Sequence, residues 1–160
     1  MWVVGVGYNN DQKDPAGENA KNDIIELGFS GVKEVRTLQT YVIDGVINGK
    51  EVEKIAGELL ADKIIQFFNY SQFSAEGRHA KNLVQSRNVW AVEVFFRKGV
   101  MDPVGLSVEK AVGMMGISGV SVRTGTTYVI KGELKGSELK TICEKCLANG
   151  MIQTYRYQRL

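Results

Sequence analysis

The sequence has few of the residues on which most catalytic and metal sites depend. Its 160 residues include one histidine, His79, and two cysteines, Cys143 and Cys146. Most acid–base, nucleophilic-triad and zinc chemistries would therefore have to work with a single imidazole. The two cysteines are too close together to link separate parts of the chain, which favours a reducing compartment.

Long hydrophobic runs and a strong charge bias are also missing. No stretch approaches the roughly 18 uninterrupted apolar residues that a membrane span needs, and no basic segment followed by an apolar run begins the chain. The formal net charge is +2, and the Lys and Arg residues are scattered rather than gathered in a basic stripe. We expect a soluble, cytoplasmic protein that binds neither membranes nor nucleic acids.

What the sequence does contain is an internal repeat. The Asp-Pro-x-Gly motif at 14–17 returns at 102–105, an offset of 88. One residue then drops out of the second copy, and the Val-Arg-Thr motif at 35–37 returns at 122–124, an offset of 87. Aligned in this way, the two copies share 26 identities over about 68 positions, far more than chance supplies. The predicted domains are a first repeat at 1–70, a linker at 71–88 and a second repeat at 89–160.

Each copy has the pattern of alternating strands and helices β-α-β-β-α-β. The predicted elements of the first copy are a strand at 2–8, a helix from Pro15 to Gly28, β runs at 33–38 and 41–47, a helix at 50–62 and a strand at 64–70. Those of the second copy are a strand at 89–96, a helix from Pro103 to Gly116, β runs at 120–124 and 128–134, a helix with the apolar stripe Leu139, Ile142, Cys146 and Leu147, and a strand at 151–158. This order predicts an α+β fold of two ferredoxin-like units, each with two helices on one face of a four-stranded antiparallel sheet.

The Asp-Pro-x-Gly motif has the residues that begin a helix. An aspartate at the N-cap position precedes a proline at the first helical position, where its missing N–H costs nothing. The residues of this structural motif are Asp14, Pro15 and Gly17 in the first copy and Asp102, Pro103 and Gly105 in the second.

The two copies carry opposite charge. Residues 1–70 hold 7 basic and 11 acidic residues, whereas residues 89–160 hold 10 basic and 6 acidic ones. Opposite charge favours docking of one half on the other. We therefore predict that the two units form an intramolecular pseudo-dimer.

The candidate chemical motifs have ordinary structural explanations. Cys143 and Cys146 form a lone C-x-x-C in a predicted helix where the first copy has Ala56 and Leu59, so small core residues are favoured over metal ligands. The glycine pair at 5–7 lies inside a predicted strand, and His79 lies in the linker with no partner that the sequence supplies.

Two arginines are the exceptions. Arg36 and Arg123 each precede a threonine at a predicted strand end before a turn, where they could meet a phosphate or carboxylate of a partner or simply lie exposed at a sheet edge. The residues taken alone indicate a binding or assembly module with no visible active site.

The order and spacing of these motifs resemble a known family. Strand, Asp-Pro-x-Gly and helix, then Val-Arg-Thr-Gly-Thr-Thr-Tyr at 122–128 and a C-terminal Leu-Ala-Asn-Gly-Met-Ile-Gln-Thr-Tyr-Arg-Tyr at 147–157, are similar to PurS, the small subunit of phosphoribosylformylglycinamidine synthase. The family usually has one copy per chain. Two fused copies resemble the N-terminal PurS-like region of the long, single-chain form of the enzyme.

The resemblance implies a non-catalytic role in purine biosynthesis. It implies that a PurL-like synthetase uses ATP and Mg²⁺, that a PurQ-like glutaminase supplies ammonia, and that PurS-type dimers, with no cofactor of their own, bridge the two. The interface candidates are Arg36, Arg123, Arg156 and Tyr157, near predicted strand ends or on the last strand. Whether such chains associate further stays open. A second possibility is a regulatory module that binds a small molecule between the repeats, and a self-sufficient enzyme comes third.

Overall fold

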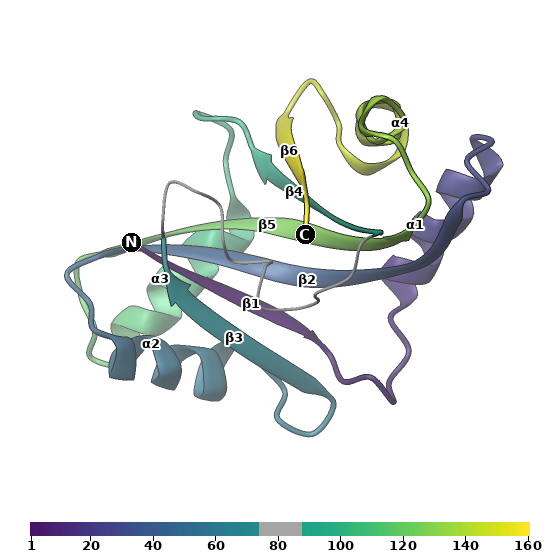
Figure 1. Ribbon diagram of the computed structural model, residues 1–160. Helices are drawn as coiled ribbons and strands as arrows, with labels where there is room; N and C mark the ends of the chain where they lie inside the picture. Colours follow the sequence, from purple (N-terminus) through teal and green to yellow (C-terminus); the bar gives the residue numbers. More distant parts are fainter. Residues whose placement is uncertain (74–87) are drawn as a thin grey trace.

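The computed structural model describes residues 1–73 and 88–160, and both copies of the repeat fold alike (Figure 1). The elements of the first copy are β1 (Trp2–Tyr8), α1 (Pro15–Glu26), β2 (Val32–Gly45), α2 (Gly49–Ile55), the π-helix η1 (Ala56–Leu60) and β3 (Gln66–Gln72). Those of the second copy are β4 (Val89–Phe96), α3 (Pro103–Met114), β5 (Val120–Gly132), α4 (Gly136–Ile142), the π-helix η3 (Cys143–Leu147) and β6 (Gln153–Arg159). The α+β class and the tandem repeat are confirmed.

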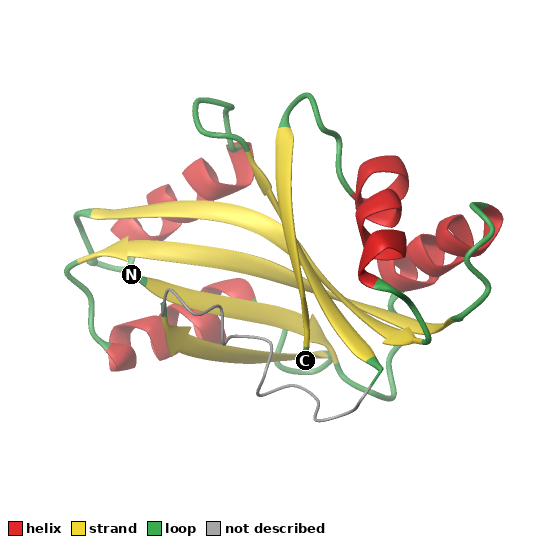
Figure 2. Ribbon diagram, turned by 45° about the horizontal axis from the view of Figure 1, so that its top comes forward, coloured by secondary structure: helices red, strands yellow, loops and turns green. Residues whose placement is uncertain are grey.

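All of these strands join one antiparallel sheet. The strand order is β3-β1-β2-β5-β4-β6, so the two copies meet at its centre through β2 and β5. The helices gather in two groups, one toward each end of the long central strands (Figure 2). None of the described helices is long and apolar enough to cross a membrane.

The two β runs predicted in the middle of each copy are one continuous strand. The predicted turn between 33–38 and 41–47 is wrong, and so is its equivalent in the second copy. Gln39 and Thr40 stand at the expected break, and neither has the positive-φ conformation or the turn preference of Gly, Asn or Pro. Uninterrupted β-compatible residues carry the strand onward, so β2 pairs with β5 along its whole length and with β1 over residues 39–43.

The junction between the copies is a nearly exact two-fold contact. Gln39 pairs with Thr126, its own equivalent in the second copy, so the pseudo-two-fold axis passes between them. The hydroxyl oxygens of the equivalent pair Thr40 and Thr127 lie 2.7 Å apart in a buried hydrogen bond. The same surface thus meets itself, as in a symmetric homodimer.

The residue that the second copy lacks has a structural place. The β2–β5 register shifts between Val32 and Glu34, which leaves Lys33 as a β-bulge. A bulge accommodates one extra residue without moving the rest of the ladder. The change of offset from 88 to 87 therefore affects the β2–β5 register only at this bulge, and the rest of the ladder stays in register.

Both main cores are built from the two copies together. One core packs residues of α1 and β2 against β4, α4 and η3, and the other packs β1, α2 and η1 against α3 and β5. In agreement, α1 lies beside α4 and α3 beside α2 (Figure 1). Each ferredoxin-like lobe of four strands and two helices is thus assembled with the helix and half-strand of the other copy. The buried residues of the first core are Ala20, Ile24, Val32, Val35, Val92, Val94, Ile130, Leu139, Ile142, Cys143 and Leu147.

The predicted linker lies mostly beyond what the structure describes. β3 runs to Gln72, two residues past the predicted strand end at Tyr70. His79 lies outside the described residues.

Candidate partner-binding site

The Asp-Pro-x-Gly motif does more than begin a helix. Asp14 caps α1 by accepting a hydrogen bond from the Gly17 N–H at 2.9 Å, and its carboxylate also accepts from the backbone N–H and the hydroxyl of Thr37 on β2. A Cβ at Gly17 would collide with the carbonyl oxygen of Val35, so this helix lies directly on the strand. The motif therefore fixes α1 to the middle strand.

The second copy repeats this arrangement. Asp102 accepts from the Gly105 N–H at 2.8 Å, from the Thr124 N–H at 2.6 Å and from the Thr124 hydroxyl. Both oxygens of this carboxylate are thus occupied within the protein. The sequence predicted the caps but missed the link to Thr37 and Thr124, although the joint return of both motifs in the two copies was its signal.

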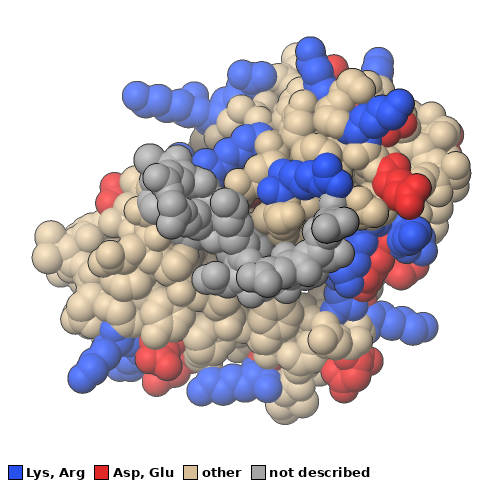
Figure 3. Space-filling model, viewed as in Figure 1, with Lys and Arg blue, Asp and Glu red and all other residues tan. Residues whose placement is uncertain are grey.

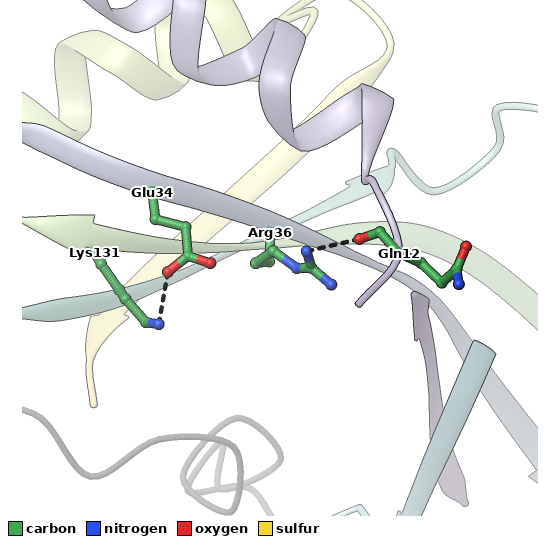
Figure 4. A network of polar contacts seen from close by, with 4 residues as sticks. All are labelled: Gln12, Glu34, Arg36 and Lys131. Carbon is green, nitrogen blue, oxygen red and sulfur yellow. Dashed lines mark hydrogen bonds and ion pairs between the residues drawn. The ribbon is translucent and has the colours of Figure 1, made fainter. Parts of the chain in front are cut away.

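Arg36 lies in a different place from the one predicted. It stands within β2 opposite Val129 of β5, so its placement at a strand end before a turn is wrong. Its guanidinium donates a hydrogen bond to the backbone carbonyl of Gln12 at 3.2 Å (Figure 4). It also donates to the backbone carbonyls of Tyr8 and Asn9 at 2.9 and 3.0 Å. Arg36 thus fastens the loop between β1 and α1 to the sheet.

An ion pair joins the copies close to Arg36. Lys131 of β5 and Glu34 of β2 are 2.7 Å apart, with both side chains about half exposed (Figure 4). Such a pair contributes at most about 1 kcal/mol. The pair matters more for the specificity of β2–β5 pairing than for stability. The equivalent residues at the other end of the ladder are Asp44 and Ser121, which cannot form an ion pair.

Arg123, the equivalent of Arg36, is not engaged by the described part of the chain. It also stands within its strand, β5, opposite Val42, so its predicted place at a strand end is wrong as well. Its side chain is exposed and makes no hydrogen bond or ion pair with any residue in 1–73 or 88–160. It lines a pocket of about 380 Å³ beside the loop from Arg97 to Met101. A smaller pocket, of about 120 Å³, lies beside Arg36.

A second pocket adjoins the first and lies between the copies. It has a volume of about 290 Å³ and shares Phe95, Phe96, Lys98 and Arg123 with the first. The first copy contributes Val3, Val42 and Phe73, and the second adds Glu93, Thr154 and Arg156. In the view of Figure 3, Lys and Arg side chains gather at the top of the molecule, where Figure 1 places β4, β6 and the loop after β4.

Arg156 is committed to an ion pair inside the protein. Its guanidinium contacts Glu93 on the neighbouring strand β4, and the Glu93 side chain is only 5% exposed. A carboxylate at such a depth needs a partner, because its desolvation costs several kcal/mol. The same positions in the first copy are Gly5 and Asn69, so this pair belongs to the second copy alone.

Tyr157 is part of the packing around a core. It is half-buried on the edge strand β6, with its ring centroid 6.2 Å from that of Trp90 and 6.4 Å from that of Tyr155. Of the four predicted interface residues, Arg36 and Arg156 have their charges engaged within the described chain and Tyr157 has its ring packed. Arg123 has the most freedom to bind something else. A partner role for the four stays a prediction.

The cysteines occupy a core position. Cys143 is fully buried in the first core, and burial, with smaller contributions from Glu144 and Cys146, raises the pKa of its thiol to about 12. Cys146 is partly buried, and burial raises its pKa too. Thiols with raised pKa values are poor nucleophiles and poor ligands. Among the described residues, no group of three or more His, Cys, Asp or Glu side chains could hold a metal ion.

A comparison with known protein families finds a match to each copy of the repeat. Residues 2–73 and residues 89–160 each match the family model PurS, described as phosphoribosylformylglycinamidine (FGAM) synthase. The chain belongs to the PurS family. It therefore has a role associated with FGAM synthase in purine biosynthesis, as the resemblance implied. A search of the curated proteins finds no match.

Proposed function

We propose that this chain is a non-catalytic assembly component that bridges the synthetase and the glutaminase of FGAM synthase and supports the transfer of ammonia between them. The observation that carries the proposal is the double PurS match on a pseudo-dimer whose lobes share a backbone but differ in surface. Two dissimilar lobes suit two dissimilar partners, a PurL-like synthetase and a PurQ-like glutaminase. ATP and Mg²⁺ would be bound by the synthetase, and the complex would work in the cytoplasm.

Sedimentation tests this proposal. The chain alone should sediment as a compact monomer of 17.7 kDa. Mixed with the two enzymes, Mg²⁺-ADP and glutamine, it should join a complex of defined stoichiometry that does not form when it is left out. Binding to neither enzyme under any of these conditions would overturn the proposal.

An activity measurement separates bridging from catalysis. Leaving the chain out should abolish synthesis driven by glutamine and spare synthesis driven by added ammonium chloride, because only the first needs transfer between subunits. Equal loss of both activities would show that the chain is needed for the synthetase reaction itself.

The pocket between the copies favours a second candidate, a module that binds a small molecule. It is lined by residues of both repeats, as that function requires. This candidate predicts that an amino acid such as glutamine or glutamate raises the melting temperature of the chain with no other protein present. No shift at millimolar concentrations of either would remove it.

A further inference from the structure

The loop that precedes the first helix of each copy has the same backbone turn but different surface chemistry in the two copies. In both copies this loop turns through one hydrogen bond, Gln12 N–H to the Asn9 carbonyl and Val100 N–H to the Arg97 carbonyl. The second copy nevertheless lacks the two acidic residues of the first and has a lysine and three larger apolar residues at neighbouring positions. The pairs, first copy to second, are Asn10 and Lys98, Asp11 and Gly99, Lys13 and Met101, Ala16 and Val104, and Glu18 and Leu106.

The apolar residues of this region are at least half exposed. Met101 is 71% exposed, Val104 50% and Leu106 54%. The first copy has polar residues at two of the equivalent positions and alanine at the third, so the fold does not require large apolar side chains there. Met101 directly precedes the N-cap and Leu106 is the fourth residue of α3, two positions on the same side of a helix start, so both are available to contact another molecule.

The basic residues of this region are not neutralised within the described chain. Arg123 and Lys98 line the pocket without a hydrogen-bond or ion-pair partner among residues 1–73 and 88–160. Asp102 lines it too, so three basic residues, with Arg97 as the third, face one carboxylate, which accepts its hydrogen bonds from Gly105 and Thr124. The pocket is therefore a concave site with net positive charge, which attracts an anion.

We propose that this pocket receives a carboxylate side chain from a segment of a partner protein, and that apolar neighbours of this carboxylate pack on Met101 and Leu106. The guanidinium of Arg123 can grip a carboxylate through two parallel hydrogen bonds, and Lys98 adds a second charge. A free small acid would fill the pocket but leave the apolar residues of α3 exposed, so a protein segment suits the whole surface better. The inference rests on the proposed function for the identity of the partner, a subunit of FGAM synthase.

The test compares variants of the full chain in binding to the synthetase and, separately, to the glutaminase. R123Q should weaken binding to one of the two about tenfold or more, since a charge-assisted hydrogen bond is lost. M101K and L106E should weaken the same complex, and the first copy shows that this backbone tolerates lysine and glutamate there. K140Q, an exposed lysine of α4, is the charge-matched control and should change nothing. All variants should keep the melting temperature of the wild type.

A second measurement does not depend on FGAM synthase. A synthetic peptide of alternating aspartate and leucine is titrated into the ¹⁵N-labelled chain, next to a counterpart with asparagine for aspartate. The acidic peptide should shift the amide signals of residues 95–104 and 122–124, and R123Q should abolish these shifts.

The possible outcomes separate the inference from the proposed function. Peptide shifts that depend on Arg123, with no binding of the wild type to either enzyme, would support the surface and overturn the proposed function. Equal binding of wild type and R123Q to both enzymes, with no peptide shifts, would overturn the inference alone. Acetate or phosphate saturating the same amides as tightly as the peptide would show a site for small anions and overturn docking of a protein segment.

Discussion

The two repeats share a backbone down to single hydrogen bonds, yet the described residues engage the arginine of the first copy and leave its equivalent in the second copy without a partner. Arg36 donates to three carbonyls of its own loop, whereas Arg123 lines an open pocket of about 380 Å³. The conserved helix-capping network beside it is the same in both copies. The difference teaches that the fold demands the aspartate and the threonine of this network, while the arginine makes hydrogen bonds to other described residues in the first copy alone.

The edge strands show the same division. Glu93 and Arg156 form an ion pair where the first copy has Gly5 and Asn69, on strands with identical register. Charge has thus been added to the second copy on a framework that works without it.

The largest expected effect comes from separating the copies. Residues 1–73 alone should not fold as a monomer, because Ala20 and Ile24 of α1 pack in a core completed by the second copy. A domain stability of about 5–15 kcal/mol would be lost altogether. Circular dichroism should show an unfolded chain at low concentration, with structure appearing only through concentration-dependent dimerisation.

Mixing this fragment with residues 88–160 is the control. The two together should regain a cooperative thermal transition and sediment as a one-to-one complex. A cooperative transition of monomeric 1–73 at micromolar concentration would mean that the cores are not shared as described.

An intermediate effect should follow from breaking the ion pair of the second copy. R156M should lower the free energy of unfolding by about 2 kcal/mol, since it leaves the buried Glu93 carboxylate unpaired while its own site is half exposed. Urea denaturation measures this loss. Because variants of Arg156 lower stability, a loss of partner binding in them cannot be assigned to the interface alone.

Two controls bracket this prediction. The double variant E93M/R156M should recover most of the loss, because no charge remains buried. N69A, at the equivalent position of the first copy, should cost less than about 0.5 kcal/mol. If R156M and N69A lowered the free energy of unfolding equally, the two edge strands would not differ in this way.

The effect that is smallest at neutral pH concerns Cys143, which occupies the position of Ala56. Because its pKa is raised to about 12, the thiol stays protonated in the folded chain while the unfolded chain ionises above about pH 8.5. This contribution to stability is complete below that pH and should be lost by up to about 1.4 kcal/mol per pH unit as the pH rises toward 12.

C143A installs the residue of the first copy and should flatten this dependence. Burial also raises the pKa values of Tyr41 and Tyr128, so both proteins keep a common alkaline loss and only their difference reports on the thiol. Urea denaturation at pH 8, 9 and 10 makes the comparison. Parallel pH profiles would contradict the assignment.

Much of the architecture could be predicted from the sequence because its signals are local. The strands at 2–8 and 89–96 and the helix starts at Pro15 and Pro103 are confirmed, and Gly28 and Gly116 follow the helix ends with positive φ. Alternating apolar residues, N-caps and C-terminal glycines act within a few residues, so they can be recognised without knowing the fold. The candidate site was predicted only in part, because the identical neighbourhoods of Arg36 and Arg123 gave no reason to separate them.

The sequence by itself determined the repeat, the order of most elements, the family and the caps of the first helix in each copy. Only the tertiary structure decided that the middle strands run straight through, that each core is shared, and that Arg36 but not Arg123 is engaged by other described residues. The physical reason is distance along the chain. A cap depends on residues three positions away, whereas the choice between a turn and a continuous strand depends on pairing with β5, some 75 to 100 positions further on.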